Sequence, residues 1–100
     1  MNVVPIDTRG ITFTLFTAAP KLDENGVAKT DRQGHPQYSV QLVAQRQDNT
    51  RASMLNVTVT DPGVLKLAVP CKVKVTGLEA GALNGGNLWF RAERVEPTAA

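Results

Sequence analysis

The chain has 100 residues, of which 42% are hydrophobic and 20% are charged. That length fits one domain, and the apolar fraction is too high for a disordered chain. No apolar run approaches the ~20 residues of a membrane-spanning helix, and none at the N-terminus has signal-peptide length, so we expect a cytoplasmic protein. One cysteine and one histidine leave too few ligands for a structural zinc site, which normally uses four.

The charge balance is slightly basic. Eleven Lys and Arg residues stand against nine Asp and Glu residues, which gives a net charge of +2. So small an excess permits nucleic-acid binding without indicating it. The deciding question is whether the positive side chains share one face of the fold.

Alternation of apolar and polar residues predicts five short strands, because successive side chains of a strand point to opposite faces. The runs span residues 11–15, 38–42, 55–60, 69–76 and 88–93. Asp61 and Pro62 are suited to cap and begin a short helical turn over residues 64–67. With no long helix expected, the pattern predicts an all-β fold, a closed or nearly closed small barrel.

Residues 21–37 form a long polar stretch with turn signals at residues 23–26 and 32–36. Such length is unusual in a small domain, so we expect either a functional loop or a long projecting hairpin. The glycine-rich residues 81–87 predict a second hairpin between the last two strands. We identify no internal repeat, and we expect one domain over residues 1–97 with a disordered tail at 98–100.

The sequence offers little for catalysis. The only histidine, His35, lies in a turn, and no spacing places it beside Ser39 or Ser53 for a catalytic triad. The glycines of residues 81–86 lack the lysine and the helix of a phosphate-binding loop. Cys71 shares the apolar parity of its run and is expected to be a buried hydrophobic residue. We therefore expect no enzyme, no catalytic residue, no cofactor and no metal.

Nucleic-acid features are stronger. Small barrels hold single strands on strand surfaces that combine basic groups with stackable side chains. The alternative is that outward basic residues serve solubility and edge protection, and the pattern favours neither reading. The arginines in question lie in the polar stretch, around one turn and in or just after the last run: Arg32, Arg46, Arg51, Arg91 and Arg94.

Two aromatic residues could stack on bases. Tyr38 shares the parity of the apolar residues in its run, so a position at the margin of the core is the alternative. Trp89 has the opposite parity to Leu88 and Phe90, which predicts partial exposure. It could serve as a stacking platform or in a subunit interface, and we favour the interface.

A series of short motifs runs through residues 29–97. It comprises Arg32-Gln33-Gly34-x-Pro36-x-Tyr38-Ser39, Val57-Thr58-Val59-Thr60-Asp61, Val73-x-Val75, Gly86-Asn87-Leu88-Trp89-Phe90 and Arg94-Val95-Glu96-Pro97. This order resembles the gene-five type of single-stranded-DNA-binding protein of filamentous phages. More loosely, the chain resembles small replication regulators of actinomycete plasmids and integrative elements. The resemblance implies a five-stranded OB-like barrel that forms a two-fold dimer and coats single-stranded DNA cooperatively.

The resemblance also implies site residues. Arg32 matches an arginine that contacts the DNA backbone, and Tyr38, displaced by one residue, matches a tyrosine near the DNA channel. Arg94 matches one of two arginines in the last strand of the family; the other falls on Ala92, for which the adjacent Arg91 is the expected substitute. Two positions with exposed tyrosines in the phage family fall on Arg46 and Arg51, whose guanidinium planes can stack on bases and neutralise phosphates. The implied dimer contacts come from Val73, Val75, Leu83, Leu88 and Trp89.

The leading interpretation is a dimeric protein that binds single-stranded DNA, or RNA, without sequence preference and serves replication or transfer of a phage or mobile element. We expect a second copy and replication proteins as further partners, and no membrane. The alternative is a dimeric adaptor in a plasmid or phage replication complex without DNA binding of its own. A continuous basic channel would favour the first, whereas Asp48 and Glu93 interleaved with the arginines would favour the second.

Overall fold

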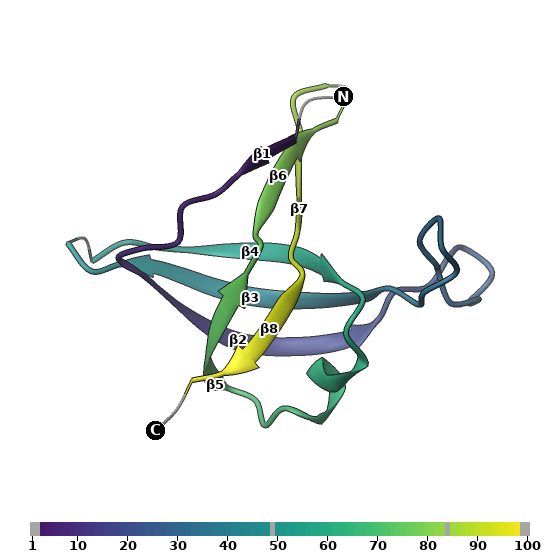
Figure 1. Cartoon of the computed structure of the whole chain (residues 1–100), viewed down its shortest axis with the longest axis horizontal. Helices are drawn as coiled ribbons and strands as arrows, with labels where there is room; N and C mark the ends of the chain where they lie inside the picture. The colour runs from purple at the N-terminus through teal and green to yellow at the C-terminus, as the bar shows by residue number, and fades with distance from the viewer. Residues whose placement is uncertain (1–2, 49, 84, 99–100) are drawn as a thin grey trace.

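A computed structural model describes residues 3–48, 50–83 and 85–98 of the chain. Within these residues a single curled sheet, a half-barrel, contains eight strands in the order β1-β6-β7-β4-β3-β2-β5-β8 (Figure 1). The all-β prediction is therefore confirmed. In chain order the elements are β1 (Val3–Pro5), β2 (Ile11–Pro20), β3 (Tyr38–Arg46), β4 (Ala52–Val59), the 3-10 helix η1 (Pro62–Lys66), β5 (Cys71–Thr76), β6 (Glu79–Ala82), β7 (Leu88–Arg91) and β8 (Arg94–Pro97).

Eight strands stand where five were expected. The strand β1 was not foreseen. The strands β5 and β7, which lie within the last two expected runs, are each followed after a two-residue bend by a further strand. In Figure 1, β5 with β6 and β7 with β8 cross the β2–β3–β4 meander as two long bent ribbons. Gly77 makes the first bend with φ of 68°, and a Cβ atom there would lie 2.7 Å from Glu93 Cγ. Only glycine tolerates both that conformation and that close approach.

The short helix η1 follows the expected capping chemistry. The Asp61 side chain accepts a hydrogen bond from the Gly63 N–H at 2.9 Å, and Pro62 begins the helix. Val64 is fully buried and ties the helix to the core. In the described part of the chain, neither this helix nor any other has the length and apolar character needed to cross a membrane.

The core lies on the inner face of the curled sheet, where the alternating residues of the expected strands meet. A bulge at Phe16 shifts the register of β2 against β3, so that Ala18 takes the inward position after Leu15. This shift explains why the alternation ends at residue 15 although β2 continues to Pro20. The buried residues are Phe13, Leu15, Val40, Leu42, Val57, Val59, Val64, Val73, Val75, Leu78, Ala92 and Val95.

The polar stretch between β2 and β3 folds into two turns of one design, which we call the first turn (residues 21–28) and the second turn (residues 29–36). In the first, Asp23 Oδ1 accepts the N–H groups of the residues two and four positions on, at 2.8 and 3.0 Å. In the second, Asp31 Oδ1 does the same at 2.9 and 2.9 Å. Gly26 and Gly34 complete the turns with φ of 78° and 85°. The sequence beneath is an eight-residue repeat, Lys-x-Asp-x-x-Gly-x-x, which contradicts the expectation of no internal repeat.

Three backbone hydrogen bonds join the two turns to the sheet. The N–H of Lys21 donates to the Gln37 carbonyl at 2.9 Å, that of Lys29 to Lys21 at 2.8 Å, and that of Gln37 to Lys29 at 2.9 Å. Both turns consequently project from the same end of the β2–β3 pair, at the right of Figure 1.

The expected C-terminal tail begins with an ordered residue. Thr98 donates to the Lys72 carbonyl from its N–H at 3.1 Å and from its hydroxyl at 3.4 Å. The remaining tail residues, Ala99 and Ala100, lie outside the described residues. Thr98 thus extends the pairing of β8 with β5 by one residue.

Candidate nucleic-acid interface

The expected DNA-binding residues lie in three groups, two of which adjoin each other. Tyr38 and Arg46 lie at opposite ends of β3, about 26 Å apart at ~3.3 Å per residue. None of the depressions that the described residues line contains all six positions. The three groups are Arg32 with Tyr38 and Arg91, then Arg46 with Arg51, and then Arg94, whose depression adjoins that of Arg91 at Thr60 and Glu93.

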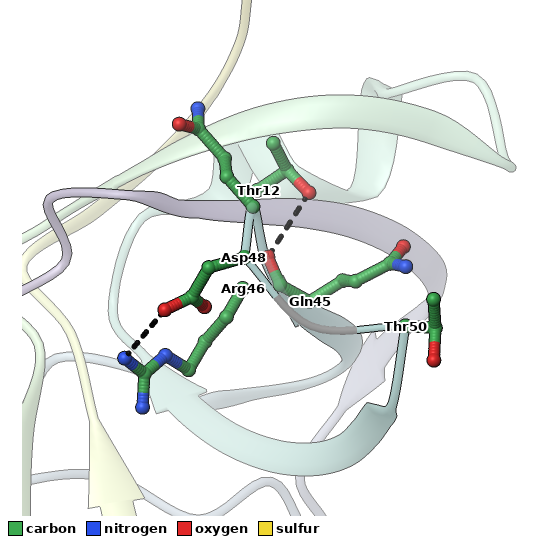
Figure 2. Close-up of a pocket in the computed structure, with 6 residues that line it drawn as sticks. Thr12, Gln45, Arg46, Asp48 and Thr50 are labelled. Atoms are coloured by element: carbon green, nitrogen blue, oxygen red, sulfur yellow. Dashed lines mark hydrogen bonds and ion pairs between the residues drawn. The ribbon is translucent and has the colours of Figure 1, made fainter.

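The second region is the turn between β3 and β4. Figure 2 shows its depression, where Thr12 Oγ1 donates to the Gln45 carbonyl at 3.3 Å. Arg46 donates from Nη2 to Asp48 Oδ2 at 3.2 Å, in an exposed ion pair. Such pairs contribute little stability, but Asp48 reduces the positive potential around Arg46. The lining residues are Thr12, Gln45, Arg46, Gln47, Asp48 and Thr50.

The third region surrounds Arg94 on β8. Arg94 Nη1 lies 3.5 Å from Glu96 Oε1, and both side chains are exposed. The depression beside it is lined by one arginine and three carboxylates, Asp61, Glu93 and Glu96, together with Thr60. This surface is not basic, and it matches the interleaving of charges that the adaptor alternative predicted.

In the first region, two adjoining depressions meet at Arg91. Together they join the second turn, the start of β3, the end of β4 and the β6–β7 pair. Both are lined by Asp31, Gln37 and Arg91. We call this surface the Arg91 groove, and its full lining is Thr30, Asp31, Arg32, Gln33, Gln37, Thr58, Val59, Thr60, Glu79, Arg91, Ala92 and Glu93.

Ion pairs and hydrogen bonds fix most charges of the Arg91 groove. Arg91 Nε donates to Glu79 Oε1 at 2.9 Å, and Lys21 Nζ donates to Thr58 Oγ1 at 3.0 Å. Arg32 is exposed and forms no ion pair within the described residues. Arg32 is therefore the positive group of the groove that is most available to a ligand.

The carboxylate of Asp31 is engaged inside the second turn. Besides its two backbone hydrogen bonds, its Oδ2 lies 3.3 Å from His35 Nδ1. The backbone N–H of His35, followed by that of Gln33 and the His35 ring, lowers the pKa of Asp31 below its ordinary value. Asp31 thus stays ionised at neutral pH and stabilises the turn that carries Arg32.

Tyr38 follows Gln37 of the groove and begins β3. It lies directly opposite Val59, and its half-buried side chain packs against the core. This is the position at the core margin that the sequence left open. Cys71, expected to be buried, is likewise half-buried and packs against the core.

The implied dimer residues separate into buried and exposed ones. Val73 and Val75 are only 3% and 5% exposed, so they belong to the core of this chain and offer almost no surface to a second copy. The inward parity of β5 directs both side chains to the inner face of the curled sheet, so the part they were expected to play in an interface stays a prediction. Leu83 and Leu88 are 52% and 62% exposed, and Trp89 is half-buried.

Sequence reasoning missed three residues of the groove, Gln37, Thr58 and Glu79, and it also missed Lys21, which donates to Thr58. Thr58 has outward parity in its run, and the Lys-x-Asp-x-x-Gly repeat marks Lys21, so both positions had a signal. Glu79 had none, because β6 is too short and too rich in alanine and glycine to show alternation.

No protein-family model matches the chain, and neither curated proteins nor solved structures give a match. In the described part of the chain, no three His, Cys, Asp or Glu side chains are grouped so that they could hold a metal ion.

Proposed function

We propose that the chain binds single-stranded nucleic acid in the Arg91 groove. The observation that carries this proposal is that Arg32 and Arg91, from the second turn and from β7, line one groove beside Trp89. Single strands are held by grooves that pair phosphate-binding cations with a stackable aromatic ring. Gln37, Thr58 and Thr60 add uncharged polar groups that suit base edges and sugars.

The strand pairings support an OB-like barrel. The strands β2, β3 and β4 form a meander, β5 pairs with β2, and β7 pairs in parallel with β4. Counting β5–β6 and β7–β8 as two bent strands gives a ring of five, with η1 between the third and the fourth. OB folds bind nucleic acid on their second and third strands. The loop between the first and second strands and the loop between the fourth and fifth strands also contribute. Here those loops are the double turn and the β6–β7 connection.

The salt dependence of binding tests the size of the site. For single strands, log affinity falls with log salt by about 0.7 per phosphate contact. Two contacts, from Arg32 and Arg91, predict a slope of about −1.4, whereas about four contacts through all the arginine groups would give about −3. We would titrate labelled poly-dT and follow its anisotropy at several salt concentrations. The absence of binding at low salt would overturn the proposal.

Matched alanine variants test the place of the site. Arg32→Ala should weaken binding to all sequences alike and reduce the salt slope by about 0.7, because it removes one phosphate contact. Arg46→Ala removes an equally exposed arginine at the far end of β3 and should change neither quantity. If Arg32→Ala and Arg46→Ala lower the affinity equally, the nucleic acid contacts both ends of β3 and the site is not confined to the Arg91 groove.

We also propose a homodimer, formed through the strands β1, β6 and β7 at one edge of the sheet. Its register places Val4 opposite Ala80, Ala80 opposite Phe90 and Ala82 opposite Leu88, so these residues share one uncharged face. Val4 is 57% exposed, and an apolar face of this kind is typical of an interaction site. Leu88→Glu should convert the dimer into monomers, and light scattering measures the molecular mass of both proteins. A monomeric wild-type protein would refute the proposed homodimer.

The adaptor without DNA binding remains the second candidate. It is favoured by the ion pairs that engage Arg46, Arg91 and Arg94 with carboxylates. A protein that is dimeric but binds no single strand at low salt would support it. The role in replication or transfer of a phage or mobile element rests on the motif resemblance alone, in either case.

A further inference from the structure

Trp89, the one tryptophan of the chain, lies against the backbone of β6. Gly81 is directly opposite it in the β6–β7 ladder. A Cβ atom at position 81 would lie 2.8 Å from Trp89 Nε1 and would collide with two ring carbons. Only glycine leaves room for the indole here, so one face of the ring is covered by backbone and its position is fixed by packing.

Arg91 lies beside the indole on the same face of β7. Residues two apart in a strand share a face, and the guanidinium carbon of Arg91 is 5.3 Å from the centre of the Trp89 ring. Leu88 and Phe90 point to the opposite, apolar face. Trp89 therefore belongs to the side of the sheet that carries Arg91 and not to the face on which we place the dimer contact.

We propose that Trp89 is a stacking site for one nucleobase of the bound strand, with Arg91 contacting the adjoining phosphate. This inference rests on the proposed function. Gly81 covers one face of the indole, and the Arg91 guanidinium lies over the ring, so movement of Arg91 towards a phosphate uncovers the indole for a base. Arg91 must leave Glu79 to reach a phosphate, and an exposed ion pair opposes that exchange only weakly. Glu79 is thus a built-in competitor of the nucleic acid for Arg91.

The emission of the single tryptophan tests the stacking directly. We would titrate the full chain with a dT oligonucleotide and with an abasic oligonucleotide of the same length. The dT strand should quench the emission, while the abasic strand should bind through its phosphates and leave the emission close to that of the free protein. Equal quenching by both strands would overturn the stacking.

Variants test the same site without relying on the emission of Trp89. Trp89→Phe should keep the affinity for dT within about twofold, whereas Trp89→Leu should lower it about tenfold, with an unchanged salt slope. Gly81→Ala should also weaken binding, because its methyl group displaces the indole. Leu65→Ala removes an exposed leucine of η1 that lies outside both the groove and the proposed dimer face, so this control should bind like the wild type.

A separate pair of variants tests the role of Glu79. Glu79→Gln should raise the affinity severalfold by releasing Arg91, while Glu96→Gln, which breaks the pair with Arg94, should not. Wild-type affinity in Trp89→Leu and in Gly81→Ala would overturn this inference and leave the proposed function standing. If neither oligonucleotide binds the wild type at low salt, the proposed function fails and the inference with it.

Discussion

The two turns between β2 and β3 have the same backbone and carry different side chains. Each uses an aspartate to accept two backbone N–H groups and a glycine with positive φ to close the turn. At the position after the aspartate, the first turn has Glu24 and the second has Arg32. Only the second lines the Arg91 groove, while Glu24 belongs to a separate depression with Leu22 and Lys29.

In both turns, the residues that determine the backbone conformation differ from the residues that are able to contact a ligand. An aspartate and a glycine at fixed spacing satisfy the backbone, because the carboxylate replaces the missing hydrogen-bond partners and glycine adopts positive φ without strain. The positions between them make no backbone demand, so they are free to differ. In the second turn this variable position holds Arg32, which lines the same depression as Arg91. In the first turn it holds Glu24.

The largest expected effect comes from exchanging these tip charges. Arg32→Glu should weaken binding of poly-dT by tenfold or more, since loss of one charge-assisted contact costs about 1.5–3 kcal/mol and the new carboxylate repels phosphate. Glu24→Arg, the matched change in the first turn, should alter the affinity by about twofold at most. Anisotropy titrations at one salt concentration compare the two.

Circular dichroism and thermal melting are the control, because both positions are exposed and both variants should fold like the wild type. If Glu24→Arg strengthens binding as much as Arg32→Glu weakens it, the two turns contact the ligand equally. The assignment of the ligand to the second turn would then be abandoned.

A smaller effect is expected from removing the aspartate that builds each turn. Asp31→Ala should weaken binding by about threefold, because the turn loses two hydrogen bonds worth about 0.5–1.5 kcal/mol each and Arg32 is less well placed. Asp23→Ala should loosen the first turn to a similar degree without changing the affinity. Amide hydrogen exchange of Gln33 and Asn25 measures the two local losses, and anisotropy measures the binding. Equal binding by both variants would show that the order of the second turn is irrelevant to the site.

Much of the fold was predictable because one face of most strands is buried. The inward parity of Val40, Leu42, Val57 and Val59 gave the meander and its core, and Asp61-Pro62 gave the helix η1. The strands β6 and β8, which follow the bends after β5 and β7, were missed. Each has only four residues, mostly small or charged, and so shows no alternation of apolar and polar residues. The site was predictable only in part: Arg32 and Arg91 come together through tertiary pairing of distant elements, which periodicity does not report.

The smallest expected effect concerns the pH dependence of the two turns. It depends on the residue four positions after the aspartate of each turn. There the second turn has His35, whose ring contacts Asp31, while the first has Val27, which cannot make that contact. The pKa of Asp31 lies below its ordinary value of 3.8, chiefly through the His35 backbone N–H. A lowered pKa in the folded state means that the ionised form stabilises the turn at pH values above the ordinary pKa. That stabilisation is lost as the pH falls through the lowered pKa of the folded protein.

His35→Val gives the second turn the residue of the first and removes only the side-chain contact. The backbone N–H at position 35 remains, so the pKa of Asp31 should rise part of the way towards its ordinary value and not reach it. The carboxyl carbon shift of Asp31, followed by NMR during acid titration, measures this change, and the amide shifts of residues 33 and 35 should titrate with it. Titration of Asp31 at or above its ordinary pKa in the wild type would contradict the hydrogen bonds on which the design of the second turn depends. A complete return to the ordinary value in His35→Val would instead assign the whole effect to the ring, and the two turns would then differ in backbone as well as in side chains.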